Sequence, residues 1–318
     1  MTGAAPGGPS PFASSADGRL LRLASVASMA TAALLLTVKL GAWLATDSVA
    51  LLSSTIDSLI DLGASGITFL AVRQALVPAD HEHRFGHGKA EPLAALAQAG
   101  LICGSGLFVV TEAVGKLISP APLEHSVLGM WVMVFALLAT FMLTRLQLYV
   151  VRKTGSVAVE ADSLHYLSDF LLNGGVLAAL LVERLTGWGL VDPLAGLAVA
   201  GWLLFNAWKI GASAYDHLMD HELPEEERRE IRDLVLAHPD VRGLHDMRTR
   251  SDGKRRFIQL HLEMDGAMTL YRAHAVAETI EAELQTRFPD ADVIVHEDIP
   301  VAADETPHYH SRTTEGVF

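Results

Sequence analysis

The 318-residue sequence contains one cysteine, Cys103, and few charged residues. A single thiol excludes an intramolecular disulfide and any zinc site with two or more cysteines, so a bound metal needs carboxylates and imidazoles. Charged residues make up 19% of the chain, apolar residues make up 50%, and the mean hydropathy is +0.31. This composition is unusual for a soluble domain and indicates a membrane protein.

Basic residues are scarce, and the acidic excess is unevenly distributed. Residues 1–220 contain 12 Lys and Arg against 16 Asp and Glu, whereas residues 221–318 contain 12 against 21. The first part is therefore charge-poor and the second is an acidic, ordinarily charged segment, with a domain boundary expected near Leu218–Pro224. An acidic segment without a basic stripe argues against nucleic acid as a partner.

Six apolar segments have about the 20 residues that a bilayer requires. They are approximately Leu20–Ala45, Val49–Val77, Leu93–Ile118, Ser126–Val150, Val157–Leu185 and Val191–Leu218. A cleaved signal peptide does not explain six such segments. We predict a flexible leader over residues 1–18, a six-span all-α transmembrane domain over 19–220, a cytosolic domain over 221–300 and a disordered tail over 301–318.

The basic residues of the short connections predict the orientation. Most of them fall on one side, on the N-terminal flank and in the second and fourth connections: Arg19, Arg22, Arg73, Arg84, Lys89, Arg145, Arg152 and Lys153. The other side has Lys116 and Arg184. We expect both termini in the cytoplasm of a multi-pass membrane protein.

The acidic segment reads as alternating helices and strands. A helix is expected from Pro224 to about His238, strands over Val241–Thr249 and Arg256–Met264, a helix over Tyr271–Arg287 and a strand over Asp292–Glu297. The order αββαβ predicts a small α+β domain.

Acidic residues and an imidazole interrupt two of the apolar segments. Asp57 and Asp61 are four residues apart, as are His165 and Asp169, so each pair shares one helical face. A charge at the bilayer centre costs roughly 2.5–3.5 kcal/mol, which makes such residues functional candidates. A lone Asp could be a helix contact, but two pairs with no intramembrane Lys or Arg nearby favour a four-ligand divalent metal site, suited to zinc. Asp162 and Glu160 are interpreted as interfacial.

Histidines recur outside the apolar segments. Asp80, His83 and His87 follow the second segment at spacings of three and four, where the alternative is a polar loop. In the predicted strand, His261 alternates with apolar residues and shares a face with Gln259 and Glu263. His245, His274, His296 and Asp298 lie on the other elements of the same domain.

Three motifs together resemble the cation diffusion facilitator family, in its bacterial zinc and ferrous-iron efflux branch. They are VALLSSTIDSLID (Val49–Asp61), PADHEHRFGHGKAE (Pro78–Glu91) and ADSLHYLSD (Ala161–Asp169). The resemblance covers about Leu20 to Pro300. It implies a proton-coupled exporter with six spans per protomer. It also implies that two protomers form a homodimer, which is held together by a metallochaperone-like cytosolic domain.

The resemblance also implies roles for individual residues. Asp57, Asp61, His165 and Asp169 would form the transport site, and Asp80, His83 and His87 a second site in the loop. A two-metal cytosolic site would use His245, His261, His296 and Asp298, with His274 as a further candidate. Lys89 and Asp220 would pair to hold the protomers together, although a snorkelling lysine and a helix-terminal acid are equally ordinary.

No nucleotide-binding or phosphorylation motif occurs in the sequence, so transport energy must come from another gradient. Ligands that bind either metal or protons provide the coupling, because metal binding displaces protons. We predict a transporter, and not an enzyme, that exports divalent metals, most readily Zn(II), in exchange for protons across a lipid membrane. Fe(II), Mn(II) or Cd(II) as main cargo and a metal-sensing membrane scaffold remain alternatives. An intramembrane hydrolase is disfavoured, because neither His-Glu-x-x-His nor Gly-x-Gly-Asp is present.

Overall fold

The computed structural model describes residues 16–46, 49–118, 127–186 and 191–300, which form two compact units, Met1–Leu218 and Met219–Phe318. The predicted tail and all but the last three residues of the predicted leader lie outside the described residues. Ala16, Asp17 and Gly18 belong to the first helix.

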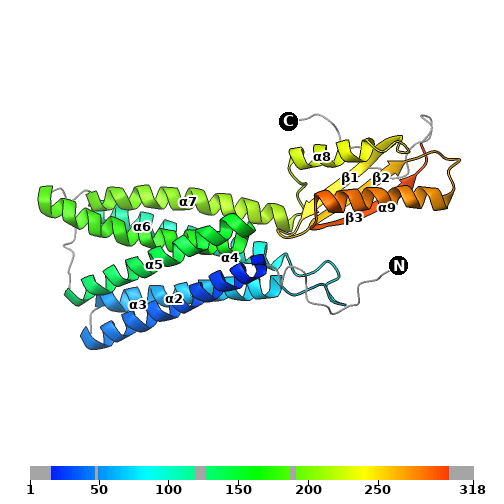
Figure 1. Ribbon diagram of the computed structural model, residues 1–318. Helices are drawn as coiled ribbons and strands as arrows, with labels where there is room; N and C mark the ends of the chain where they lie inside the picture. The colour runs from blue at the N-terminus through cyan, green and yellow to red at the C-terminus, as the bar shows by residue number, and fades with distance from the viewer. Residues whose placement is uncertain (1–15, 47–48, 119–126, 187–190, 301–318) are drawn as a thin grey trace. The chain divides into compact units, whose positions relative to one another are not determined.

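The first unit consists of long helices, drawn from blue to yellow-green in Figure 1. They are α2 (Ala16–Thr46), α3 (Val49–Ala75), α4 (Ala90–Ile118), α5 (Val127–Thr154), α6 (Val157–Thr186) and α7 (Val191–Leu218). Each agrees with a predicted span to within four residues at either end. Among the described residues, five helices are long and apolar enough to cross a membrane. α6 is equally long, but Asp162, His165 and Asp169 interrupt its apolar run.

α6 is the central helix of this unit, because it contacts each of the other five. The closest pairs around it are α4 with α7 and α2 with α3. Alanines such as Ala99, Ala161 and Ala207 line the contacts between α4, α6 and α7. Small side chains allow helix backbones to approach closely, which is how helices associate in lipid. Most side chains of residues 157–168 of α6 are consequently buried in protein.

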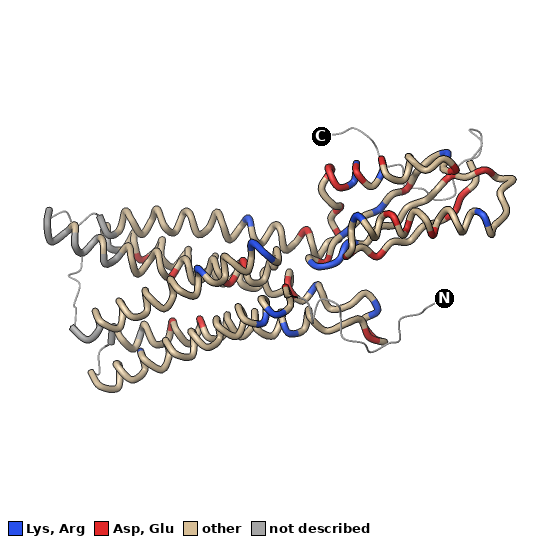
Figure 2. The backbone as a smooth tube through the Cα atoms, viewed as in Figure 1, with Lys and Arg blue, Asp and Glu red and all other residues tan. Residues whose placement is uncertain are grey.

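Charge is concentrated at one end of the helical unit. Figure 2 shows Lys and Arg gathered where α2 and α4 begin and where α3 and α5 end. Arg73 lies in the last turn of α3, and Arg152 and Lys153 lie in the last turn of α5. The remainder of these helices is predominantly apolar, as a bilayer requires.

The second unit has the predicted αββαβ order. Its elements are α8 (Glu225–Leu236), β1 (Gly243–Ser251), β2 (Arg256–Glu263), α9 (Leu270–Arg287) and β3 (Ala291–Asp298). The sheet order is β1-β2-β3, with β1 antiparallel and β3 parallel to β2. Gly253 makes the β1–β2 turn with φ of +91°, a conformation that glycine adopts readily. The predicted fold class, a helical transmembrane domain with a small α+β domain, is confirmed.

The core of the second unit lies between the helices and one face of the sheet. Ile231 of α8, Leu260 of β2 and Ile280 of α9 are among its fully buried side chains. The residues of β2 alternate, so Leu260 and Leu262 face this core while Gln259 and His261 lie on the opposite face. The parallel register of β2 and β3 sets His261 beside His296, and the antiparallel register sets it beside His245.

Candidate metal centres

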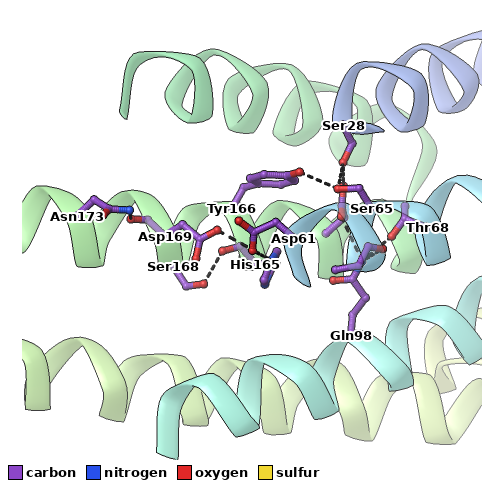
Figure 3. Close-up of polar contacts among 12 residues, drawn as sticks. Ser28, Asp61, Ser65, Thr68, Gln98, His165, Tyr166, Ser168, Asp169 and Asn173 are labelled. Atoms are coloured by element: carbon purple, nitrogen blue, oxygen red, sulfur yellow. Dashed lines mark hydrogen bonds and ion pairs between the residues drawn. The ribbon is translucent and has the colours of Figure 1, made fainter. Parts of the chain in front are cut away.

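Three potential ligands meet between α3 and α6 (Figure 3). His165 Nε2 lies 3.1 Å from Asp61 Oδ1 and 3.9 Å from Asp169 Oδ2. One donor atom from each of the three residues lies within 4.8 Å of the others, a spacing that could hold a metal ion. His165 is only 4% exposed, whereas both carboxylates are half-buried. The i,i+4 spacing predicted that His165 and Asp169 share a face of α6, but their approach to Asp61 depends on the packing of α3 against α6.

The arrangement of His165 fits a metal ligand. Its Nε2 faces the two carboxylates, and its Nδ1 is buried without a hydrogen-bond partner among the described residues. Asp57 lies one turn before Asp61, is exposed, and does not belong to the close group. Two carboxylates and an imidazole make three donors of a tetrahedral site, so Asp57 remains a prediction as the fourth.

The expectation that no intramembrane Lys or Arg lies near the acidic pairs is wrong. Lys39 is a half-buried residue of α2 and interacts electrostatically with Asp57 and Asp169. Sequence reasoning missed it because Lys39 is on a different span, and its proximity depends on the packing of the helices.

Asp162, interpreted above as interfacial, lies in the interior of the helical unit. Its side chain is 0% exposed and accepts hydrogen bonds from Ser28 Oγ at 2.6 Å, Gln98 Nε2 at 3.1 Å and Gln147 Nε2 at 2.5 Å. Asp162 is buried because α6 is the central helix, a property that the sequence of α6 alone does not reveal. Glu160, two residues earlier, is exposed.

The loop between α3 and α4 brings together its three predicted residues. Asp80 Oδ1 lies 3.5 Å from His83 Nδ1, and Asp80 Oδ2 lies 3.5 Å from His87 Nε2. The backbone N–H groups of His83 and Glu82 donate to Asp80 Oδ1, and with both imidazoles they hold the pKa of Asp80 below its usual value. A carboxylate that stays ionised beside two imidazoles is suited to bind a divalent cation.

The second unit holds a third group of potential ligands on the exposed face of its sheet. His261 Nδ1 lies 2.8 Å, and His245 Nε2 3.3 Å, from Asp298 Oδ2. Partial burial acts to raise the pKa of Asp298, but the hydrogen bond with His261 and the charges of three neighbouring imidazoles outweigh it and lower that pKa. His245, His261 and Asp298 are thereby arranged as three metal donors.

The other two predicted histidines lie at the edge of this group. The His296 ring centroid is 4.5 Å from that of His261, and its Nε2 is 3.4 Å from Asp298 Oδ1. His274 is on α9 with a side chain 66% exposed, and it faces Glu278 and Glu297 at 3.5 and 3.6 Å. His274 is therefore not part of the three-residue group.

Two further carboxylates lie beside this group. The alternation along β2 predicted Glu263 on the face of His261 but did not identify it as a ligand, and Asp246 was not predicted. Glu263 Oε1 lies 3.1 Å from His245 Nδ1, and Asp246 Oδ2 lies 3.8 Å from His261 Nε2. Asp246 sits at an irregularity in the β1–β2 register and has φ of +43°. A bulge re-aims a side chain, so alternation along β1 gave no signal for Asp246.

The predicted pair Lys89–Asp220 involves residues of the two different units. Lys89 Nζ donates to the carbonyl of Leu218 at 3.2 Å, and Asp220 forms an ion pair with Arg250 at 3.2 Å. The role of Lys89 and Asp220 in a dimer stays a prediction.

The first unit is a bundle of membrane-spanning helices that contains a cluster of potential carboxylate and imidazole ligands. The α+β unit that follows it contains another such cluster. Together these features are typical of an integral membrane metal transporter. Residues 25–219 match the family model described as the cation efflux transmembrane domain, and residues 223–299 match the cation efflux protein cytoplasmic domain. The chain belongs to the cation diffusion facilitator family, whose members export divalent metal ions and are not enzymes. It is a multi-pass membrane protein.

Individual relatives extend over nearly the same length. The cation-efflux pump FieF of Cronobacter sakazakii is 48% identical over 283 residues, which are 88% of this chain and 93% of the relative. FieF of Escherichia coli is 47% identical over 281 residues with the same coverage. The metal-bound C-terminal domain of the CzcD transporter from Thermotoga maritima is 29% identical, covers 24% of this chain and 94% of that domain, and has a TM-score of 0.22.

The cytosolic group is expected to bind metal independently of the membrane helices. A fragment of residues 219–300 contains every element of the second unit and its core, so we expect it to fold alone. Calorimetry should detect zinc binding with release of protons, because imidazoles bind metal only when deprotonated. His261→Ala should weaken this affinity by more than about 100-fold, the upper end of the effect of losing an outer-shell partner alone, whereas His238→Ala, outside the group, should not. A folded fragment that binds no zinc would remove His245, His261 and His296 from the predicted ligands.

Proposed function

We propose that the protein exports Zn(II) from the cytoplasm across the bacterial inner membrane in exchange for protons. The observation that supports this most directly is the group of Asp61, His165 and Asp169 between two membrane helices. Intramembrane ionisable residues are costly, so they mark ion pathways by default. Here the group also has the donor types and spacing that a divalent cation requires.

The donor set favours zinc as cargo. Zinc accepts both imidazole and carboxylate in a four-coordinate site, for which Asp57 is the proposed fourth ligand. Oxygen-rich sites also suit harder ions, and affinity alone ranks zinc above iron(II) and manganese. Fe(II) is the alternative cargo, since three of the four proposed ligands are carboxylates. Mn(II) and Cd(II) are further candidates, and the competition assay described below tests all three.

Exchange for protons supplies the energy that metal export requires. Moving a +2 ion outward against an inside-negative potential of about 100 mV requires about 4.6 kcal/mol, before any concentration gradient. One proton returning inward halves the net charge that moves. His165 and the two carboxylates bind either metal or protons. The site therefore binds the metal when these groups are deprotonated and releases it when they are protonated.

The remaining proposals concern topology and assembly. The basic end of the bundle, with Arg73, Arg152 and Lys153, favours a cytoplasmic location for both termini. We infer a homodimer through the cytosolic domain, supported by the family match over residues 223–299. Lys89 and Asp220 would hold the two copies near the membrane surface, and the loop and cytosolic groups would bind regulatory or structural zinc.

Flux measurements in proteoliposomes test the proposal. Purified protein should transport zinc in the presence of an opposing proton gradient, and an entrapped pH-sensitive dye should report protons moving the other way. Collapsing the gradient with an ionophore should reduce zinc flux at least several-fold. Zinc flux that is indifferent to the gradient and moves no protons would indicate passive facilitated diffusion. Competition by Fe(II), Mn(II) and Cd(II) in the same assay ranks the cargoes.

A further inference from the structure

A second polar group lies beside the proposed transport site and is built around Asp162. Its carboxylate is fully buried and accepts from Ser28 of α2, Gln98 of α4 and Gln147 of α5. Each of these donors is itself fully buried. Since Asp162 belongs to α6, one carboxylate links four helices inside the helical unit.

The Asp162 carboxylate sets the direction of a chain of hydroxyl groups, drawn in part in Figure 3. The Ser28 and Ser65 oxygens are 2.9 Å apart, and the Ser65 and Tyr166 oxygens are 2.7 Å apart. Each hydroxyl has one hydrogen, and an ionised carboxylate only accepts. When Asp162 is ionised, Ser28 donates its one hydrogen to the carboxylate, so Ser65 donates to Ser28 and Tyr166 donates to Ser65.

The chain ends at the two helices that carry the proposed ligands. Ser65 is four residues after Asp61 on α3, and Tyr166 directly follows His165 on α6. The Ser65–Tyr166 bond thus joins α3 to α6 within about one helical turn of the 3.1 Å contact between Asp61 and His165. A hydrogen-bond chain of fixed direction inside a low-dielectric bundle resists rearrangement.

We propose that Asp162 is a positioning residue for metal transport, which acts through Ser28, Ser65 and Tyr166 to hold His165 opposite Asp61. Asp162 itself contacts no cargo in this proposal. The inference rests on the proposed role of Asp61 and His165 as ligands. Outer groups that orient metal ligands typically change metal affinity by about 10–100-fold when they are removed.

Asp162→Asn is the direct test. Asparagine has the same shape, but its amide N–H must face either Gln98 or the pair Ser28 and Gln147, all of which donate to Asp162. We expect the KM for zinc to rise by about 10–100-fold, with a smaller change in the maximal rate. The part of the tetrahedral Co(II) absorption of the detergent-solubilised protein that Asp61→Ala abolishes should lose intensity in Asp162→Asn.

Two gentler variants keep the test informative if Asp162→Asn does not fold. Ser28→Ala breaks the chain in its middle, and Tyr166→Phe removes only the terminal hydroxyl; both leave the Asp162 carboxylate in place. Each should raise the KM for zinc in the same direction, by about 10-fold at the lower end of the expected range. Ser163→Ala is the matched control, because Ser163 is adjacent to Asp162 but donates to the Glu160 carbonyl instead. It should leave the KM unchanged.

A purely structural role makes a different prediction. If Ser28→Ala and Tyr166→Phe lower the melting temperature or the maximal rate but leave the KM and the Co(II) spectrum unchanged, the inference is overturned. Its failure is distinguishable from failure of the proposed function. If Asp61→Ala stops transport while the chain variants behave like Ser163→Ala, the ligand assignment stands and only the positioning role is wrong.

Discussion

Asp61→Ala and His165→Ala are each expected to lower zinc transport by more than about 100-fold, the upper end of what loss of an outer-shell partner alone produces. Each removes one donor from a group of three that lies between α3 and α6. Alanine supplies no replacement ligand, and lipid-embedded helices give the metal little water to compensate. The measurement is zinc uptake into proteoliposomes, with circular dichroism and size-exclusion chromatography to verify folding.

The matched control is Glu160→Gln, which removes an exposed acidic group from the same helix as His165. Its zinc uptake should equal that of the unmodified protein. Asp57→Ala is informative in a different way, because Asp57 lies outside the close group. Strong loss in Asp57→Ala would indicate a fourth protein ligand, and mild loss a three-residue site completed by another donor. Unchanged uptake in Asp61→Ala would refute the transport site.

His165→Asp is expected to change both the metal preference and the pH response. The substitution keeps a donor but replaces imidazole with an oxygen ligand, and oxygen ligands suit harder ions such as manganese. The ratio of zinc to manganese flux should therefore fall, by about 10-fold or more if it follows the loss of one preferred ligand. A protonated imidazole does not bind metal, so acidification lowers zinc binding in the unmodified protein. Without an imidazole, the variant should show a flatter decline as pH falls.

The measurement for His165→Asp is zinc and manganese flux at a series of pH values with a constant proton gradient. Arg73→Lys, which preserves the charge at the end of α3, is a control for general effects of substitution on flux. An unaltered pH profile in His165→Asp would show that the remaining carboxylates carry the exchanged protons, because crowding in a low-dielectric site favours their protonation. His165 would then remain a ligand but not the principal proton carrier.

Local pattern was sufficient for the architecture. Apolar runs of bilayer length predicted all six long helices, since hydropathy over about 20 residues does not depend on distant contacts. The αββαβ order followed from local helix and strand patterns such as the period-two alternation around His261. Spacing also grouped Asp80 with His83 and His87, because residues that are close in sequence are close in space.

Only the tertiary structure decided which distant residues meet. Asp162 is buried and Lys39 lies near the acidic pairs because helices α2, α3 and α6 pack together, which no single span encodes. Strand register brings His245 and Asp298 to His261, and an irregularity in that register adds Asp246 while His274 stays outside. Sequence by itself determined the elements and the residue types available for metal binding. Packing determined their grouping, because contacts between separate helices and strands depend on the whole set of side chains between them.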